Sequence, residues 1–174
     1  MFKLFLFLLL SVGAVSLSWA SLRDPRSHGF YRFFAFEMVL GITLLNIDLW
    51  FTDPFALFHV ISWLLLLFSL VTVVLGFYAL RKYGEPVGGV DATTRLVTRG
   101  IYRYIRHPLY GSLVFFAWGV FFKKPWFVAL ILAIGASIFL YITARIEEKL
   151  TLQKFGEPYA EYMQRTKMII PMLI

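Results

Sequence analysis

The sequence has no cysteine and few charged residues, and each shortage restricts what the protein can be. Without cysteine the chain forms no disulfide, no cysteine-ligated zinc site and no cysteine nucleophile. Charged residues fill only 16% of the 174 positions, whereas a soluble domain usually carries about 25%. The three histidines are scattered along the chain, and we expect no metal site.

Hydrophobic residues are abundant, and they favour an integral membrane protein. They make up 60% of the chain, and the mean hydropathy is +0.75, well above the values of soluble domains. Aromatic residues add 19%, which suits side chains at lipid and headgroup depth. The net charge of +7 then indicates an anionic membrane face as partner, and no nucleic acid.

Five apolar stretches predict an all-α fold with five transmembrane helices. They cover residues 4–22, 30–51, 54–80, 107–122 and 125–144. The first is long enough to span, but a cleaved signal peptide is an alternative, because Ser18-Trp19-Ala20 loosely resembles a cleavage site. The fourth is short for a crossing and should begin with Pro108 in its first turn. Only Lys123-Lys124 separates the last two stretches, so they should form a tight C-terminal helical hairpin.

The basic residues predict the orientation. Fourteen of the 17 lie around the first connection, in the loop 81–106 and in the tail after residue 144. The positive-inside rule puts those segments in the cytoplasm of a multi-pass cell-membrane protein, with the N-terminus outside. We therefore expect three transmembrane helices in residues 1–80. Residues 81–174, within the same single domain, should hold the hairpin and a cytoplasmic cofactor-binding cap, whose tail extends the last helix and adds an amphipathic segment.

Two clusters hold most of the chemistry. Residues 98–111 combine arginines, tyrosines and His107-Pro108 at the membrane surface, where an interfacial lipid anchor is the simpler interpretation. If that segment were helical, Arg99, Arg103 and Arg106 would share one face. The pair Glu147-Glu148 follows the last span, and adjacent carboxylates on a helix point about 100° apart, so the two rarely serve one partner.

The residues in these clusters carry a resemblance. Gly100, Tyr102 and the run Arg106-His107-Pro108-x-Tyr110-Gly111 come first, and Glu147-Glu148, Phe155-Gly156, Tyr159, Tyr162 and Pro171 follow after the hairpin. This order resembles the isoprenylcysteine carboxyl methyltransferase family and its prokaryotic relatives, over residues 75–171. Phospholipid and thiol methyltransferases of membranes are similar in the same region, as is the C-terminal part of the nicotinamide-dependent sterol reductases.

The resemblance implies an S-adenosylmethionine-dependent methyltransferase, with S-adenosylhomocysteine as product and a lipophilic or prenylated acceptor at the cytoplasmic membrane face. Carboxyl O-methylation is the expected reaction. The implied cofactor-binding residues are Leu96, Val97, Gly100, Tyr102, His107, Pro108, Tyr110, Glu147 and Tyr159. Arg106, Arg103 and Glu148 are the catalytic candidates, and Arg106 or Arg103 would hold a substrate carboxylate in a bidentate contact. An amine or thiol acceptor would need a proton acceptor instead, for which His107 or a glutamate is available.

One ionisable residue lies inside a predicted span. Glu37 is a candidate for substrate contact or for pairing with an arginine of the site, because charges within spans are functional by default. It shares a helix face with Asp48, eleven positions later. Alternatives to a methyltransferase are a nicotinamide-dependent membrane reductase, with Arg95, Arg99 and Arg103 as its phosphate site, and a non-enzymatic membrane scaffold.

Overall fold

The computed structural model describes residues 1–52, 55–85, 87 and 93–170, and this part of the chain is all-helical. Its helices are α1 (Phe2–Leu22), α2 (His28–Asn46), η1 (Ile47–Leu49), α3 (Leu57–Tyr83), η2 (Gly100–Arg103), α4 (Pro108–Phe121), α5 (Phe127–Phe155) and α6 (Glu157–Arg165). The predicted all-α class is confirmed for these residues, which contain an isolated β-bridge but no strand. Pro171, part of the family pattern, lies outside the described residues.

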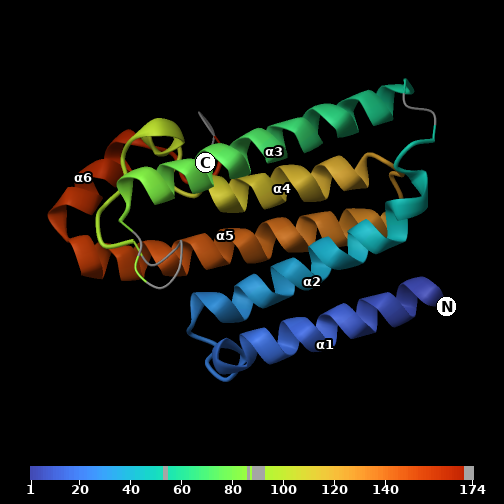
Figure 1. Cartoon of the computed structure of the whole chain (residues 1–174), viewed down its shortest axis with the longest axis horizontal. Coiled ribbons are helices and arrows are strands. Elements are labelled where there is room, and N and C mark those ends of the chain that lie inside the picture. The colour runs from blue at the N-terminus through green and yellow to red at the C-terminus, as the bar shows by residue number, and fades with distance from the viewer. Residues whose placement is uncertain (53–54, 86, 88–92, 171–174) are drawn as a thin grey trace.

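Five long helices lie side by side in the order α1, α2, α5, α4, α3 (Figure 1). The tightest contacts are between α3 and α4 and between α2 and α5, whereas α1 packs mainly against α2. Small residues allow this proximity: Ala129, Ala133 and Ala136 of α5 are fully buried, and a Cβ on Gly76 of α3 would come within 2.8 Å of Leu109 on α4. The outward faces carry exposed Leu, Phe and Val, as lipid contact requires.

Four helical segments are long and apolar enough to cross a membrane. They are α1, the continuous segment of α2 and η1 (His28–Leu49), α3 and α5. The multi-pass membrane class is thus supported by the structure. The remaining predicted crossing, the fourth along the chain, is α4, which has only 14 residues and a length of about 21 Å. Its first residue is Pro108, as expected. Helix α4 packs along α3 and α5 as one arm of the predicted hairpin.

The basic segments gather at one end of the bundle. The connection between α1 and α2, the described parts of the loop before α4, and α6 with the tail all lie at that end (Figure 1). Helix α5 extends to Phe155, and α6 follows it after Gly156, whose φ of +61° favours glycine at this sharp turn. The predicted extension of α5 and the amphipathic segment after it are therefore both confirmed.

The tail runs back along the segment that precedes α4. The backbone N–H groups of Arg106 and His107 donate to the carbonyls of Lys167 and Met168, and the Lys167 N–H donates to the Tyr104 carbonyl. These bonds keep the chain extended just before Pro108, so helix η2 ends at Arg103. The single helical face that spacing suggested for the three arginines is therefore wrong: Arg99 and Arg103 are exposed, while the Arg106 side chain is turned inward.

The opposite end is closed by a separate polar cluster. The Asn46 amide donates to the Val120 carbonyl at 3.0 Å, and His59 Nε2 lies 2.8 Å from the Lys123 carbonyl. The Lys123 ammonium donates to the Trp50 carbonyl at 3.2 Å and lies 3.5 Å from the centre of the Trp63 ring. These contacts fix the turn between α4 and α5 to helices α2 and α3.

Candidate functional site

A cavity of about 580 Å³ lies at the end of the bundle that carries the basic segments. This volume falls within the usual range of small-molecule sites, roughly 300–1,000 Å³. Helices α2, α3, α4, α5 and α6 all contribute to its wall, together with residues between 93 and 107. The cavity therefore combines residues of α2 to α5 with residues 93–107 and 156–170, which we call the cap.

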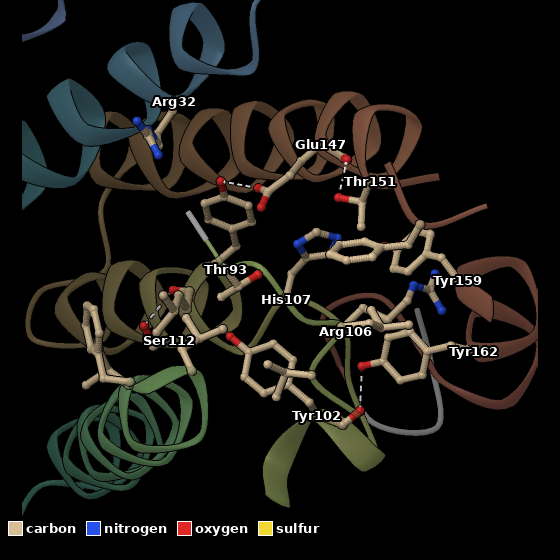
Figure 2. Close-up of a pocket in the computed structure, with 18 of the residues that line it drawn as sticks. Arg32, Thr93, Tyr102, Arg106, His107, Ser112, Glu147, Thr151, Tyr159 and Tyr162 are labelled. Carbon is tan, nitrogen blue, oxygen red and sulfur yellow. Dashed lines mark hydrogen bonds between the residues drawn. The ribbon is translucent and has the colours of Figure 1, made fainter. Parts of the chain in front are cut away.

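The cavity wall has two chemically different parts. One part is apolar and reaches toward the middle of the bundle, formed by Phe36, Val73, Phe77, Leu109 and Leu113. The other part is polar and aromatic, formed by residues of the cap and the end of α5: Tyr102, His107, Glu147, Thr151, Lys154, Tyr159 and Tyr162 (Figure 2). A ligand with a polar and an apolar portion, or two ligands of opposite character, would match this wall.

Glu147 marks the polar part of the cavity. Its carboxylate accepts a hydrogen bond of 2.6 Å from the Tyr110 hydroxyl of α4 (Figure 2). Arg32 of α2 also lines the cavity and interacts electrostatically with Tyr110. Three helices thus meet through one carboxylate, one phenol and one guanidinium at the edge of the cavity. Only one carboxylate oxygen of Glu147 bonds to Tyr110, so the other can receive a donor from a ligand.

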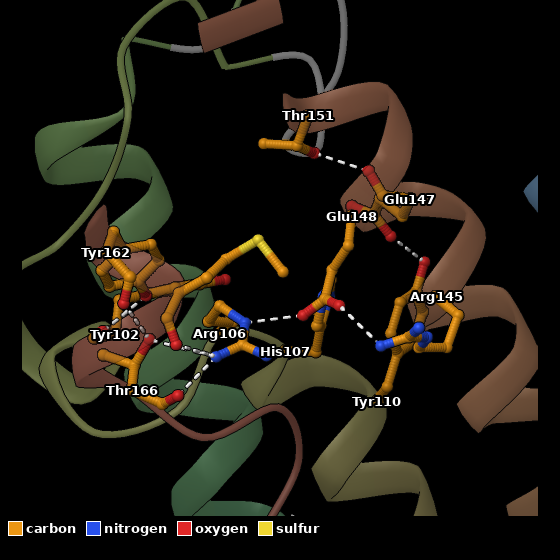
Figure 3. A network of polar contacts seen from close by, with 11 residues as sticks. Tyr102, Arg106, His107, Tyr110, Arg145, Glu147, Glu148, Thr151, Tyr162 and Thr166 are labelled. Carbon is orange, nitrogen blue, oxygen red and sulfur yellow. Dashed lines mark hydrogen bonds and ion pairs between the residues drawn. The ribbon is translucent and has the colours of Figure 1, made fainter. Parts of the chain in front are cut away.

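Glu148 lies on a different side of α5 and serves a different partner. Its carboxylate is 3% exposed and accepts from Arg106 Nε at 2.6 Å. Arg106 Nη1 donates in addition to the carbonyls of Met163, at 3.1 Å, and Thr166 (Figure 3). One guanidinium therefore connects α5, α6 and the tail. Two of its three nitrogens are engaged inside the protein by these bonds.

His107 lies between the cavity and the buried pair of Arg106 and Glu148. Its ring borders the cavity, stacks on the Tyr110 ring with centroids 5.5 Å apart, and is 8% exposed. Its Nε2 lies 3.6 Å from the Glu148 carboxylate, beyond hydrogen-bond distance, and has no other partner among the described residues. A carboxylate facing Nε2 favours a proton on that nitrogen, which leaves Nδ1 as the basic nitrogen of the ring.

Three tyrosines of the cap remain neutral over a wide pH range. Burial raises the pKa of Tyr102, Tyr159 and Tyr162 above the usual value of a phenol. The nearby Glu147 carboxylate raises the pKa of Tyr102 further. The Tyr162 hydroxyl donates to the Tyr102 carbonyl at 2.5 Å and so joins α6 to η2. These rings offer the cavity neutral aromatic faces and hydroxyl groups.

The structure brings most of the predicted site residues to one cavity. The residues on its wall are Leu96, Val97, Tyr102, Arg106, His107, Tyr110, Glu147 and Tyr159. Gly100, Arg103, Pro108 and Glu148 do not line it: Arg103 is exposed, and Glu148 lies behind Arg106. Glu37 faces α1 instead, where it accepts from the Ser11 hydroxyl at 2.5 Å. The catalytic and binding roles of all these residues stay predictions.

Several wall residues were missed from the sequence. Thr151 and Lys154 follow Glu147 by four and seven positions, so helical spacing already puts them on its face of α5. Arg32 stands near the start of the predicted stretch 30–51 and contributed only to the basic charge near the first connection, whereas the structure places it on the cavity wall, in the second turn of α2. The apolar wall of Phe36, Val73 and Phe77 gave no signal, because these residues look like any other lipid-facing or core position.

Comparison with known proteins agrees with this region of the structure. The family model described as phospholipid methyltransferase matches residues 57–158, more than half of the chain. Methanethiol S-methyltransferase of Pseudomonas deceptionensis is 29% identical over 137 residues, which cover 79% of this chain and 48% of that protein. Methanethiol S-methyltransferase 1 of Bradyrhizobium diazoefficiens is 29% identical over 97 residues, 54% of this chain and 33% of that protein.

The chain thus spans half or less of the length of these two relatives. The matched region begins with α3 and ends in the second residue of α6, so it contains α4, α5 and most of the cavity wall. The resemblance to membrane methyltransferases, inferred from the arginine, histidine and glutamate pattern, is confirmed. The chain belongs to the phospholipid methyltransferase family of membrane proteins.

Proposed function

We propose that this protein transfers a methyl group from S-adenosylmethionine to a lipophilic acceptor. The observation that carries the proposal is the cavity, in which an apolar wall from α2, α3 and α4 joins the polar wall of the cap. A water-soluble cofactor and a membrane-soluble acceptor can react only in a site that both can enter. Holding the two in line and away from water supplies much of the rate enhancement of a displacement reaction.

The residues of the polar wall fit the cofactor. Glu147 offers a carboxylate oxygen to ribose hydroxyls or to the amino group, and Lys154 offers an ammonium group to the cofactor carboxylate. The rings of Tyr102 and Tyr159 suit a sulfonium, which aromatic faces attract. Leu96 and Val97 add apolar surface for the adenine ring. When bound, the cofactor would supply the electrophilic methyl group.

The end of the bundle that holds the cavity faces the cytoplasm in this proposal. The segments richest in arginine and lysine lie at that end (Figure 1), and such segments are retained on the cytoplasmic side of membranes. S-adenosylmethionine would then reach the polar wall directly from the cytoplasm. The acceptor would come from the bilayer, toward the apolar wall of α2 and α3.

A lipophilic thiol is the acceptor that the site supports best. Both relatives are named as methanethiol S-methyltransferases, and a thiol needs a proton acceptor near neutral pH. His107 borders the cavity, and Glu148 faces its Nε2. The His107 ring would take the thiol proton, and the thiol sulfur would form a bond to the methyl carbon as the bond from that carbon to the sulfonium breaks. Glu148 would act as a positioning residue that stabilises the charged imidazolium.

A carboxylate acceptor, as in isoprenylcysteine methylation, is the second candidate. The bidentate contact predicted for Arg106 is disfavoured, because Glu148, Met163 and Thr166 already engage Nε and Nη1. Arg32 is the guanidinium that supports this candidate instead, because it lies on the cavity wall beside the apolar residues of α2. A carboxylate is ionised at neutral pH and needs no proton acceptor.

The first experiment measures cofactor binding by calorimetry with S-adenosylhomocysteine and the detergent-purified protein. We expect saturable binding that Glu147→Ala abolishes or weakens at least about tenfold, because a hydrogen-bonded charge is lost from the wall. Glu161→Ala is the matched control, since Glu161 is an exposed carboxylate on α6 that pairs with Arg165 and does not line the cavity. A folded wild-type protein that shows no binding would refute the methyltransferase proposal.

The second experiment compares acceptors by transfer of a labelled methyl group. A long-chain alkanethiol and a farnesylated cysteine derivative are assayed side by side across the pH range. If the acceptor is a thiol, the alkanethiol should be methylated, and His107→Gln should lower kcat/KM because the proton acceptor is lost. Methyl ester as the product, formed at a rate that His107→Gln leaves unchanged, would instead establish the carboxylate candidate.

A further inference from the structure

A second hollow lies on the outer face of α3, directly beside the cavity. This α3 groove has a volume of about 630 Å³ and is lined by Val73, Val74, Phe77, Tyr78, Arg81 and Lys82. Val73 and Phe77 belong to its wall and to the wall of the cavity. These two side chains therefore form the partition between the cavity and the surface of α3.

The α3 groove changes from apolar to cationic along the helix. Val73 and Val74 lie two turns before Arg81 and Lys82, a rise of about 12 Å. Lys82 donates to the Tyr78 hydroxyl at 2.7 Å, and its ammonium lies 5.1 Å from the centre of the Tyr78 ring. Tyr78 therefore holds the lysine charge over the cationic end of the groove.

The two cations have no counter-ion among the described residues. No described carboxylate lies within ion-pair distance of Arg81 or Lys82, although both side chains are exposed. Arg95, in the loop that follows α3, is by contrast paired with Glu85 at 3.0 Å. Two adjacent positive charges at the end of a lipid-facing helix attract anions at the membrane surface.

We propose that the α3 groove binds an anionic phospholipid. The phosphate would lie between Arg81 and Lys82, and an acyl chain would lie along Val74 and Phe77. A free phosphate would satisfy the two charges but leave the apolar part of the groove unfilled. A zwitterionic lipid would fill the apolar part, but its own cationic headgroup would offset the attraction of the two side chains.

A lipid in this position would also affect the cavity. Its acyl chain would cover the outer side of Val73 and Phe77, whose inner sides line the apolar wall. The anionic lipid would thereby keep the partition closed and the acceptor wall intact. The binding itself does not depend on the proposed methyl transfer, because it involves neither the cofactor nor the acceptor.

The test is native mass spectrometry of the full chain after titration with phosphatidylglycerol or phosphatidylcholine. We expect the wild type to retain phosphatidylglycerol preferentially. The double variant R81Q/K82Q should lose affinity for it on the order of thirtyfold, because each cation near an anionic lipid contributes a factor of about five. The matched control is R23Q/R26Q, which removes the same charge from exposed residues at the same end of the bundle.

Two further measurements distinguish binding of a whole lipid from binding of its phosphate group alone. Val74→Phe fills the groove without changing its charge or the cavity wall, so it should weaken retention of phosphatidylglycerol. Glycerol phosphate, added in excess, should not displace the lipid. Equal loss in R81Q/K82Q and R23Q/R26Q would overturn the proposal in favour of general charge attraction. Displacement by glycerol phosphate, or full retention in Val74→Phe, would overturn the lipid assignment.

Discussion

Arg106 is the residue whose replacement tests the structure most directly. Its guanidinium bonds to Glu148, Met163 and Thr166, and the side chains of Arg106 and Glu148 are only 9% and 4% exposed. Removing one partner of a buried pair leaves an unpaired charge and costs about 3–5 kcal/mol. Total stabilities are about 5–15 kcal/mol, so Arg106→Ala should lose a large fraction of the free energy of unfolding.

The measurement is chemical unfolding in detergent, followed by the fluorescence of the native tryptophans. Arg145→Ala is the matched control, because the Arg145 guanidinium is 55% exposed and 4.0 Å from the same carboxylate. Such an exposed pair contributes at most about 1 kcal/mol. Arg106→Lys should fall between the two, because lysine keeps the charge but not the planar fork.

The double replacement Arg106→Met with Glu148→Met provides the internal check. With both charges removed, no unpaired charge remains buried, so the double variant should be more stable than Arg106→Ala. The reasoning fails if Arg106→Ala is no less stable than Arg145→Ala. It also fails if Arg106→Ala unfolds normally but loses only catalysis, since Arg106 would then contact substrate rather than hold α5, α6 and the tail together.

Three other perturbations probe separate parts of the molecule. Tyr110→Phe removes the hydrogen bond to Glu147 and should weaken S-adenosylhomocysteine binding about tenfold by calorimetry. Tyr104 is exposed, so Tyr104→Phe should leave the affinity unchanged. Equal effects of the two replacements would contradict the placement of the cofactor beside Glu147. Lys123→Met should destabilise the fold by about 1–3 kcal/mol, because the Trp50 carbonyl loses its donor, while Lys124→Met should be neutral in the same unfolding assay. The raised pKa values of Tyr102, Tyr159 and Tyr162 stabilise the fold below the phenol pKa of about 10. Above that pH the unfolded phenols ionise first, so stability should fall as the pH rises further, and Tyr162→Phe should reduce the slope of a plot of unfolding free energy against pH.

Much of the helical architecture could be predicted from the sequence, because lipid imposes a strong rule. A span must be apolar for about 20 residues, and loops carry the charges. The stretches 4–22 and 54–80 therefore lie within a few residues of α1 and α3. The short stretch 107–122 likewise agrees with α4 within one residue at each end. What hydropathy does not describe is which helices lie beside α4, namely α2, α3 and α5.

Tertiary contacts were less accessible than helices. Lys123 and Lys124 look equivalent in the sequence, yet Lys123 is 3% exposed and bonded to Trp50, while its neighbour is exposed. Arg103 and Arg106 likewise differ only because the tail pairs with the backbone around Arg106. Such contacts join residues that lie far apart in the sequence, so no local pattern encodes them.

The pair Glu147 and Glu148 shows how one short motif can serve both the site and the fold. Consecutive residues on α5 point in different directions, so Glu147 reaches the cavity and Tyr110, while Glu148 is buried against Arg106. Arg106 and His107 are adjacent in the same way, and both face Glu148. Arg106 joins Glu148 to α6 and the tail, and His107 Nε2 lies 3.6 Å from the same carboxylate. Replacing Glu148 should therefore perturb both the fold and the surroundings of the His107 ring, whereas replacing Glu147 should affect the cavity alone.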